Sequence, residues 1–388
     1  MALKYDFGKV EFGVSIDAKK QYTIAAVILT AFASLSNRVG MDVNVYYDVF
    51  NSYPTLDSFH LKDLMDFRYE PLWVLLNVIS KSVFDNFYIL YATIIILINI
   101  FIFKFIRNYS HLPFFTLLCY YSITFLNLNF EMLRQSAAMV FIYLGLNHLF
   151  TGNRKKYMIF AFPCIFLHKS AFIIYFLIYL ASYIKIRNWQ VFACIGLFFS
   201  SSILKVVFPQ IFDLLNLALL DSGAALSHYM DKMTYEDDQL DGLKIIVVFV
   251  SRMLIPSILL LYRNQYQKQP LFDNLLIVYL FISAISPVLE VSYRMVAYLQ
   301  VFFFICLCNY LYPLIKKHNF DIFRCGSFVV MLYLFIRYYI AFSVPEPYFE
   351  RNDMSGDMRY VPYVNIFEDE PDKTREHFFY SEEGIYKK

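Results

Sequence analysis

Long stretches of apolar residues with almost no charge constrain this chain more than any other feature. Residues 87–103, 245–261 and 296–311 are nearly free of charged side chains and approach the length that crosses a bilayer. Charged residues make up only 17% of the whole chain, against about 25% in ordinary soluble domains. Long apolar segments therefore make up most of the chain, and we predict an all-α polytopic membrane protein.

The apolar runs predict about eleven transmembrane helices. Two of them, 157–168 and 170–184, are short, which suits a tight helical pair or broken, tilted helices around a polar site. Residues 71–84 are apolar but too short to cross, so a re-entrant or interfacial helix is expected there. The predicted spans are 21–36, 86–106, 112–128, 136–150, 157–168, 170–184, 189–207, 243–262, 272–288, 294–314 and 322–343.

Lys and Arg gather in the loops on one side of these spans, and this asymmetry sets the expected orientation. Acidic residues concentrate instead in two longer segments, 37–70 and 208–242. We therefore expect the N-terminus in the cytoplasm and both acidic loops on the outer face of the cytoplasmic (inner) membrane. An odd number of spans then places a tail, 344–388, outside as well, beyond a transmembrane domain formed by residues 1–343.

Polar and titratable residues collect at the predicted outer ends of the spans. Such groups are costly in a membrane, which makes them functional candidates when they face a protein interior or a wet cavity. Glu131 precedes Arg134 and Gln135 by three and four residues, so these side chains are expected to share one helix face, as are Glu290 and Arg294. The full set of candidates is Arg38, Asp42, Glu131, Arg134, Gln135, His168, Glu290, Tyr293 and Arg294.

The chemistry of this set suits an anionic ligand. Arg stays charged, and its planar fork matches phosphate oxygens, while a neighbouring carboxylate either holds the Arg in place or acts as a general base. Plain structural interpretations stay open: a capping ion pair for Glu131 and Arg134, a buried hydrogen-bonded ring for His168, a helix cap for Asp42 and snorkelling for Arg294.

Motifs for other chemistries are missing from the sequence. It contains no Gly-rich phosphate loop, no His-Glu-x-x-His and no Asp-x-Asp pair that would hold a metal and a nucleotide sugar. We therefore expect no cofactor, no metal and no nucleic-acid partner, and we favour an anionic lipid-linked substrate that enters from the bilayer.

Several short motifs occur in an order that resembles the EpsG-like family of Wzy-type exopolysaccharide, capsule and O-antigen polymerases. The resemblance runs from about residue 20 to residue 365, with Met41 where a small polar residue is commoner in the family and with a longer N-terminal extension. The motifs are Ser36-Asn37-Arg38-Val39-Gly40-Met41-Asp42 with Tyr46-Tyr47, then Tyr69-Glu70-Pro71-Leu72-Trp73, Leu133-Arg134-Gln135-Ser136, Phe166-Leu167-His168-Lys169-Ser170-Ala171, Tyr293-Arg294-Met295 and Val361-Pro362-Tyr363.

The resemblance implies a membrane glycosyltransferase with a GT-C-like helical bundle. Such enzymes transfer a growing glycan from undecaprenyl diphosphate to a new lipid-linked repeat unit, so the donor and acceptor are both undecaprenyl-diphosphate-linked oligosaccharides. On this hypothesis Arg134 and Arg294 bind the diphosphate, Arg38 holds a second one, and Gln135, Glu290 and Tyr293 complete the substrate site. Glu131 or Asp42 is the base, with Glu290 in reserve, and His168 orients the base or replaces it.

Three other functions stay open at this point. An O-antigen-type ligase would share the architecture but transfer the glycan to a different acceptor. A membrane acyltransferase would use His168 as its base. A flippase or exporter would need polar residues near the middle of the bilayer in paired halves, whereas the charges here gather near one surface. With any of these functions the protein would contact membrane lipids. The sequence leaves open whether a chain-length regulator is a further partner.

Overall fold

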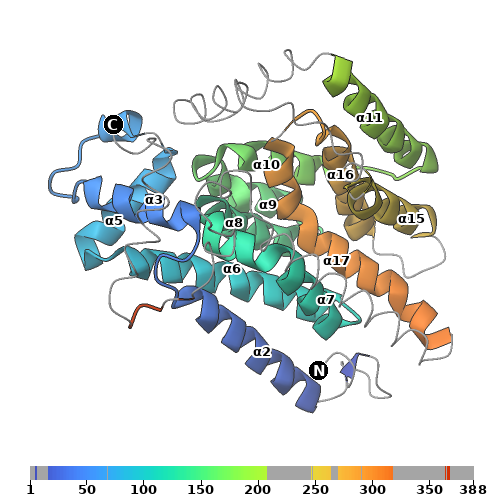
Figure 1. Ribbon diagram of the computed structural model, residues 1–388, viewed down its shortest axis with the longest axis horizontal. Coiled ribbons are helices and arrows are strands. Elements are labelled where there is room, and N and C mark those ends of the chain that lie inside the picture. The colour runs from blue at the N-terminus through green and yellow to red at the C-terminus, as the bar shows by residue number, and fades with distance from the viewer. Residues whose placement is uncertain are drawn as a thin grey trace, which may run out of the picture. The chain divides into compact units, whose positions relative to one another are not determined.

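The computed structural model describes residues 5–6, 16–67, 69–207, 246, 248–263, 270–289, 291–317, 363 and 365–367 (Figure 1). These residues divide into two compact units, Met1–Tyr175 with Leu311–Phe379, and Phe176–Tyr310 with Tyr380–Lys388, called here the first and the second unit. Within the described ranges the chain is helical and forms no strand beyond one isolated bridge between Ser36 and Asn365. Outside the described residues lie the predicted loop 208–242, the span 322–343, Glu290 and most of the tail.

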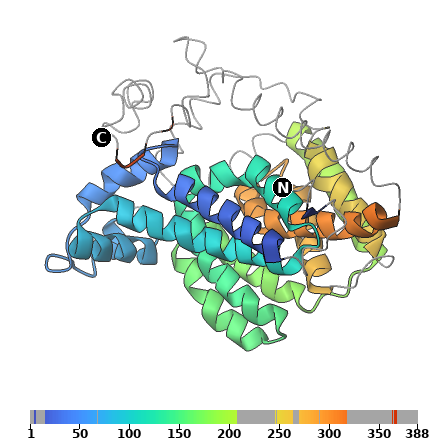
Figure 2. The same cartoon turned by 90° about the horizontal axis from the view of Figure 1, so that it is seen from below.

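The first unit is organised around α6 (Phe87–Tyr109). The first helix, α2 (Ile16–Ser34), lies alongside it in both views (Figures 1 and 2), and the hydroxyl of Tyr22 donates to the carbonyl of Phe103 at 3.0 Å. Helices α3 (Met41–Ser52) and α5 (Pro71–Phe84) lie at one end of α6, and α7 (Pro113–Tyr120) at the other. The short α4 (Asp63–Asp66) precedes α5.

Helix lengths agree with a membrane protein. Among the described residues, two helices are long and apolar enough to cross a bilayer: α6, and Val291–Pro313 within α17 (Val291–Lys317). With 23 residues, α6 is about 34 Å long at 1.5 Å per residue. The helix predicted at 71–84 forms as α5 with those bounds. The total of about eleven spans stays a prediction.

The chain from Pro113 to Glu131 is helical throughout, but its second half is wound as π-helix. Segments η1 (Tyr121–Phe125) and η2 (Asn127–Glu131) continue α7, and the amide of Met132 donates to the carbonyl of Asn127, five residues back. Met132 then leaves helical geometry, with φ −100° and ψ 47°, and α8 (Leu133–Phe150) begins at the next residue. Short π segments occur often at functional sites, and this one ends on the candidate Glu131.

A buried polar network explains where the π segments form. The side chains of Asn99 and Asn129 are fully buried and hydrogen-bond each other at 2.7 Å, while the hydroxyl of Tyr120 donates to Asn99 at 3.3 Å. Asn129 also donates to the carbonyl of Phe125 at 2.7 Å. Because a buried polar group without a partner is costly, this network fixes the register of η2 against α6.

Helix α8 turns back into α9 (Arg154–Ala161), which continues as the 3₁₀ segment η3 (Phe162–Phe166). The side chain of Asn153 caps α9 by accepting from the amide of Lys156 at 3.0 Å. Gly145 allows the two helices to touch, because a Cβ there would come within 2.7 Å of the Cβ of Ala161. Helix α10 (Lys169–Ala181) follows after the two residues Leu167 and His168.

The second unit contains α11 (Asn188–Val207), η4 (Phe249–Leu254) with α15 (Ile255–Leu261), α16 (Pro270–Ile285) and most of α17. Ser201 on α11 donates to the carbonyl of Ala284 on α16 at 2.8 Å. On the next pair of helices, the hydroxyl of Tyr310 donates to Asp273 at 2.8 Å. Side-chain hydrogen bonds thus link α11, α16 and α17, as expected where apolar packing alone gives little orientation.

Candidate functional site

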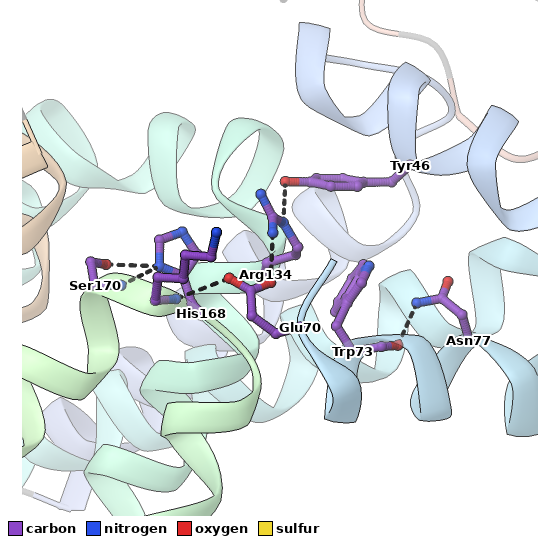
Figure 3. Close-up of polar contacts among 8 residues, drawn as sticks. Tyr46, Glu70, Trp73, Asn77, Arg134, His168 and Ser170 are labelled. Carbon is purple, nitrogen blue, oxygen red and sulfur yellow. Dashed lines mark hydrogen bonds and ion pairs between the residues drawn. The ribbon is translucent and has the colours of Figure 1, made fainter. Parts of the chain in front are cut away.

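An ion pair between Arg134 and Glu70 is the centre of the candidate site in the first unit (Figure 3). Arg134 Nη1 lies 2.6 Å from Glu70 Oε2, and the two side chains are only 12% and 8% exposed. The other carboxylate oxygen, Oε1, accepts the amide of Lys169 at 2.9 Å. Glu70 therefore holds the first turn of α8 and the first residue of α10 at once, with both oxygens committed.

Local sequence explains why Glu70 can do this. It directly precedes Pro71, the first residue of α5, and takes the extended conformation, with φ −63° and ψ 147°, that a following proline favours. Its side chain therefore points away from the helix instead of capping it. The partial positive charge at the start of α10 adds to the attraction, because an exposed helix N-terminus stabilises a carboxylate.

Aromatic rings enclose the guanidinium of Arg134. Its Nε donates to the hydroxyl of Tyr46 at 3.2 Å, and its Cζ lies 4.5 Å from the ring centre of Tyr69. Trp73 packs edge-on against Tyr46, with ring centres 5.4 Å apart. Burial raises the pKa of Tyr46 well above its ordinary value, so its hydroxyl stays protonated. All three rings are buried, so they serve as walls for Arg134 and offer no open face for stacking a sugar.

One edge of the Arg134 guanidinium is left for a ligand. Nε and Nη1 are taken by Tyr46 and Glu70, and Nη2 makes no hydrogen bond to any residue that the structure describes. Two fixed partners thus orient the fork, and the part of the chain that the structure describes leaves Nη2 uncommitted. Such an arrangement can donate hydrogen bonds to a phosphate oxygen without first reorganising.

His168 stands next to this pair, on the turn that leads into α10 (Figure 3). It is 8% exposed, and its Nδ1 lies 3.2 Å from the amide of Ser170 and 2.7 Å from the Ser170 hydroxyl. A backbone N–H can only donate, so Nδ1 accepts and the neutral ring carries its hydrogen on Nε2. The ring is therefore set up to donate a hydrogen bond from Nε2, a role other than that of the base considered from sequence.

Glu131 lies on a different element from Arg134, and the predicted shared face is wrong. Glu131 is the last residue of η2, Met132 breaks the helix, and Arg134 is the second residue of α8. The three-residue spacing therefore does not bring the two side chains onto one helix. Glu131 Oε2 instead accepts the amide of Asp42 at 3.2 Å, in the first turn of α3. Asp42 itself is exposed.

Gly40 makes the contact between Glu131 and α3 possible. Its φ is +94°, and a Cβ at this position would lie 2.3 Å from the carbonyl oxygen of Phe130, the residue before Glu131. Only glycine accepts this backbone angle and this close approach together. Arg38, two residues earlier, also has a positive φ of 49°, and its half-buried guanidinium lies over the ring of Tyr47 at 4.1 Å.

The remaining candidates are distributed as follows. Gln135 is buried, at 1% exposure, in the first turn of α8. Tyr293 and Arg294 lie in the second unit, in the first turn of α17, where the guanidinium of Arg252 sits 4.9 Å from the Tyr293 ring centre. Glu290 is outside the described residues. Whether Arg294 joins Arg134 at one site stays a prediction.

Two residues of the site belong to the sequence motifs but received no role from the sequence: Glu70, the partner of Arg134, and Tyr46, its hydrogen-bond acceptor. Glu70 stands in the acidic first outer loop, and the sequence predicts no partner for it. Its signal was present in the sequence, because a carboxylate directly before the proline that opens an apolar helix stands at a membrane surface in an extended conformation. Its pairing with a residue 64 positions away has no local signature.

Comparison with known protein families gives a match over most of the chain. The sequence matches the EpsG family over residues 19–364. No curated protein and no solved structure matches the chain. The family match extends across both units and includes every candidate residue named from the sequence.

Proposed function

Because the chain belongs to the EpsG family, we propose that it is a polysaccharide polymerase of the membrane, which extends a glycan from repeat units carried on undecaprenyl diphosphate. The observation that carries the proposal is the buried Arg134, oriented by Glu70 and Tyr46 and with Nη2 uncommitted among the described residues. A buried cation beside an apolar helix suits a diphosphate that arrives on a lipid tail. The reaction takes place on the outer face of the cytoplasmic membrane, and the N-terminus is cytoplasmic.

The bond changes follow from an activated donor. A hydroxyl oxygen of the acceptor sugar attacks the anomeric carbon of the donor glycan, and the bond from that carbon to the diphosphate oxygen breaks. The lipid diphosphate leaves with the electron pair, and the hydroxyl proton passes to a protein base. Arg134 stabilises the negative charge that grows on the leaving oxygen, which is electrostatic catalysis by a preorganised group.

Glu131 is our choice for the base. Glu70 is excluded because both of its oxygens hold other groups, and taking up a proton would weaken its grip on Arg134. Asp42 is exposed, so water would compete for it. Glu131, at the end of η2, is half-buried, and its carboxylate faces the first turn of α3, where the helix N-terminus stabilises the charged form that a base needs. His168 donates from Nε2 to a diphosphate oxygen.

The natural substrate can be obtained without knowing its sugars. Cells that lack this chain should accumulate the unpolymerised lipid-linked repeat unit, which is extracted and offered to purified protein in detergent or vesicles. Product length is then measured by gel electrophoresis and mass spectrometry. We expect the intact protein to produce a ladder of glycans on the same lipid. Glycan on a new carrier would instead indicate a ligase, and added acetyl groups an acyltransferase.

The decisive variant is Arg134→Ala. Arg134→Lys tests whether the planar, two-pronged guanidinium is needed or a positive charge alone is enough. Loss of a preorganised donor to a developing oxyanion costs about 10²–10³ in kcat, so Ala should reduce extension at least a hundredfold and Lys should restore only part of it. The matched control is Arg154→Ala, an exposed arginine at the start of α9. Chain extension by Arg134→Ala at the unmodified rate would rule out the diphosphate role.

A further inference from the structure

A short C-terminal segment, Tyr363 with residues 365–367, packs against the end of α2 within the first unit. The ring of Tyr363 stacks on Phe32 with ring centres 4.5 Å apart and an interplanar angle of 19°, and its hydroxyl donates to the carbonyl of Phe32 at 2.7 Å. Phe32 in turn meets Phe130 edge-on at 6.0 Å. Phe130 directly precedes Glu131, so the ring series from Tyr363 leads to the proposed base.

The backbone of the same segment is tied to the residues that precede the Gly40 turn. The amide of Ile366 donates to the carbonyl of Leu35 at 2.9 Å, and Asn365 forms an antiparallel bridge with Ser36. The Ser36 hydroxyl lies 2.8 Å from the hydroxyl of Tyr91, which donates to the carbonyl of Asn129 at 3.1 Å. The segment therefore reaches η2 by a second route, independent of the rings.

These contacts secure a loop that is unfavourable by itself. Between Ser36 and α3 the chain contains two residues with positive φ, Arg38 and Gly40, of which Arg38 carries a side chain. Residues in this region persist only where their surroundings hold them. The bridge to Asn365 fixes the residue just before this loop, and the stack on Phe32 fixes the helix end from which it departs.

We infer that Tyr363 and residues 365–367 form a positioning segment, which holds the Ser36–Gly40 loop and the end of η2 so that Glu131 meets the acceptor hydroxyl. The inference rests on the proposed function for the role of Glu131, but the contacts do not. The segment acts through other residues and touches no substrate. A misplacement of about 1 Å in a catalytic group can cost 100-fold in rate, which gives a distant segment a measurable effect.

The position of the segment also determines whether the number of membrane crossings before it is odd or even. The segment lies at the C-terminal end of α2, where the loop to α3 begins. In a chain that crosses a membrane, an even number of crossings must separate Ser36 from Tyr363. With α2 as the first crossing, the number of crossings up to Tyr363 is odd, and the segment is on the same face as Glu131.

A disulfide tests whether the segment stays in place during turnover. Directly opposed residues of an antiparallel pair have Cα atoms about 4.5–5.5 Å apart, which is within reach of a disulfide. Ser36→Cys with Asn365→Cys is therefore made in one chain and oxidised in membranes, and the cross-link is detected by mass spectrometry of the joined peptides. Each single variant, oxidised in the same way, controls for effects on the native cysteines.

We expect the cross-link to form and the oxidised protein to extend glycan at the rate of the same protein after reduction. Failure to cross-link would show that the two segments are not opposed and would overturn the inference. Loss of activity on oxidation, with recovery on reduction, would overturn it as well, because the segment would then have to leave during each cycle. Both outcomes are separable from failure of the proposed function, which Arg134→Ala tests alone.

Kinetics distinguish positioning from simple support of the fold. Tyr363→Leu removes the stack and the hydrogen bond, whereas Tyr363→Phe keeps the stack. We expect Leu to lower kcat about tenfold with KM within about twofold, because the diphosphate contacts at Arg134 are untouched, and Phe to stay within about threefold of the natural residue. An unchanged kcat in Tyr363→Leu, or a fall that follows only the amount of folded protein, would refute the positioning role.

Discussion

Replacing Glu70 by Gln should destabilise the protein through Arg134, and the structure sets the size of the effect. Gln keeps the shape but offers one acceptor oxygen where Glu70 now serves Arg134 at 2.6 Å and Lys169 N at 2.9 Å. Removing one partner of a buried ion pair costs about 3–5 kcal/mol. We expect about 3 kcal/mol, at the low end of that range, because Arg134 retains its contact with Tyr46 and 12% exposure.

Buried cysteines supply the assay. Among the described residues, Cys119, Cys164, Cys194, Cys306 and Cys308 are buried and form no disulfide, so the rise in labelling by a thiol-reactive fluorophore as temperature increases reports unfolding in detergent. Glu70→Gln should clearly lower the midpoint temperature of thermal unfolding. Asp57→Asn, an exposed carboxylate on the same loop, should leave it unchanged.

A double variant decides whether the ion pair is the cause. Arg134→Met removes the charge that Glu70→Gln leaves uncompensated, so the combination should be no less stable than Glu70→Gln alone. If the stability losses of the two single variants simply add in the double variant, the stated role of the ion pair is wrong. It is also wrong if Glu70→Gln unfolds at the same midpoint temperature as the natural protein.

Two other perturbations follow from the same structure. Gly40→Ala should destabilise the protein by about 3 kcal/mol or more, because the new Cβ would lie 2.3 Å from the Phe130 carbonyl oxygen at a φ of +94°. Gly196→Ala on α11 is the control, because a Cβ there would meet nothing within 4 Å, and it should stabilise the protein by about 0.5–1 kcal/mol. The same fluorescence assay compares the two variants. Asp6, ahead of α2, is buried and accepts the amide of Phe115 at 2.6 Å, and burial raises its pKa to about 8 from 3.8. A raised pKa means that the folded state holds the proton more tightly, so the contribution to stability is complete below pH 3.8 and declines as pH rises to about 8. Midpoints measured across this range should fall with pH in the natural protein and more weakly in Asp6→Asn, and equal slopes would contradict the assignment.

The sequence predicted the helical class and the candidate segments, because apolar run length and the cost of charge in lipid act locally. The helix at 71–84 shows this well: it begins at a proline and ends where the apolar run ends. The spans at 112–128 and 136–150 were predicted less well, because a π-helix needs no special composition and carries the first of them on to Glu131. Counting residues as if the helix were regular then assigned Glu131 to the wrong partner.

The pairing of Arg134 shows what a single sequence leaves open. Helical spacing predicted Glu131 as the neighbour of Arg134, whereas the structure pairs Arg134 with Glu70. Which carboxylate pairs with Arg134 depends on how α5, α8 and α10 meet, and that is decided by packing between segments far apart in the chain. Tyr46 entered the site in the same way, from α3 and 88 positions away from Arg134.

Charge balance limits what Arg134 can do alone. The pair with Glu70 is neutral as a whole, so it presents a directed donor to a diphosphate but little net positive charge. A diphosphate ester carries about two negative charges, and the carboxylate of Glu70 would repel them in a medium of low dielectric constant. Glu70 therefore orients Arg134 at a cost in affinity, and binding must draw on further cations.

The exposed Lys169, whose amide donates to Glu70, is one candidate for such a cation, and Arg294 is the one predicted from sequence. This division gives each group a separate effect. Removing a cation that only supplies net charge should raise KM in a salt-dependent way, whereas removing the oriented donor at Arg134 should lower kcat. On the proposed function, a site with one oriented arginine and further cations that supply only net charge would bind the lipid diphosphate loosely and still stabilise it strongly as it leaves. An enzyme that must release its carrier after every addition would require this combination.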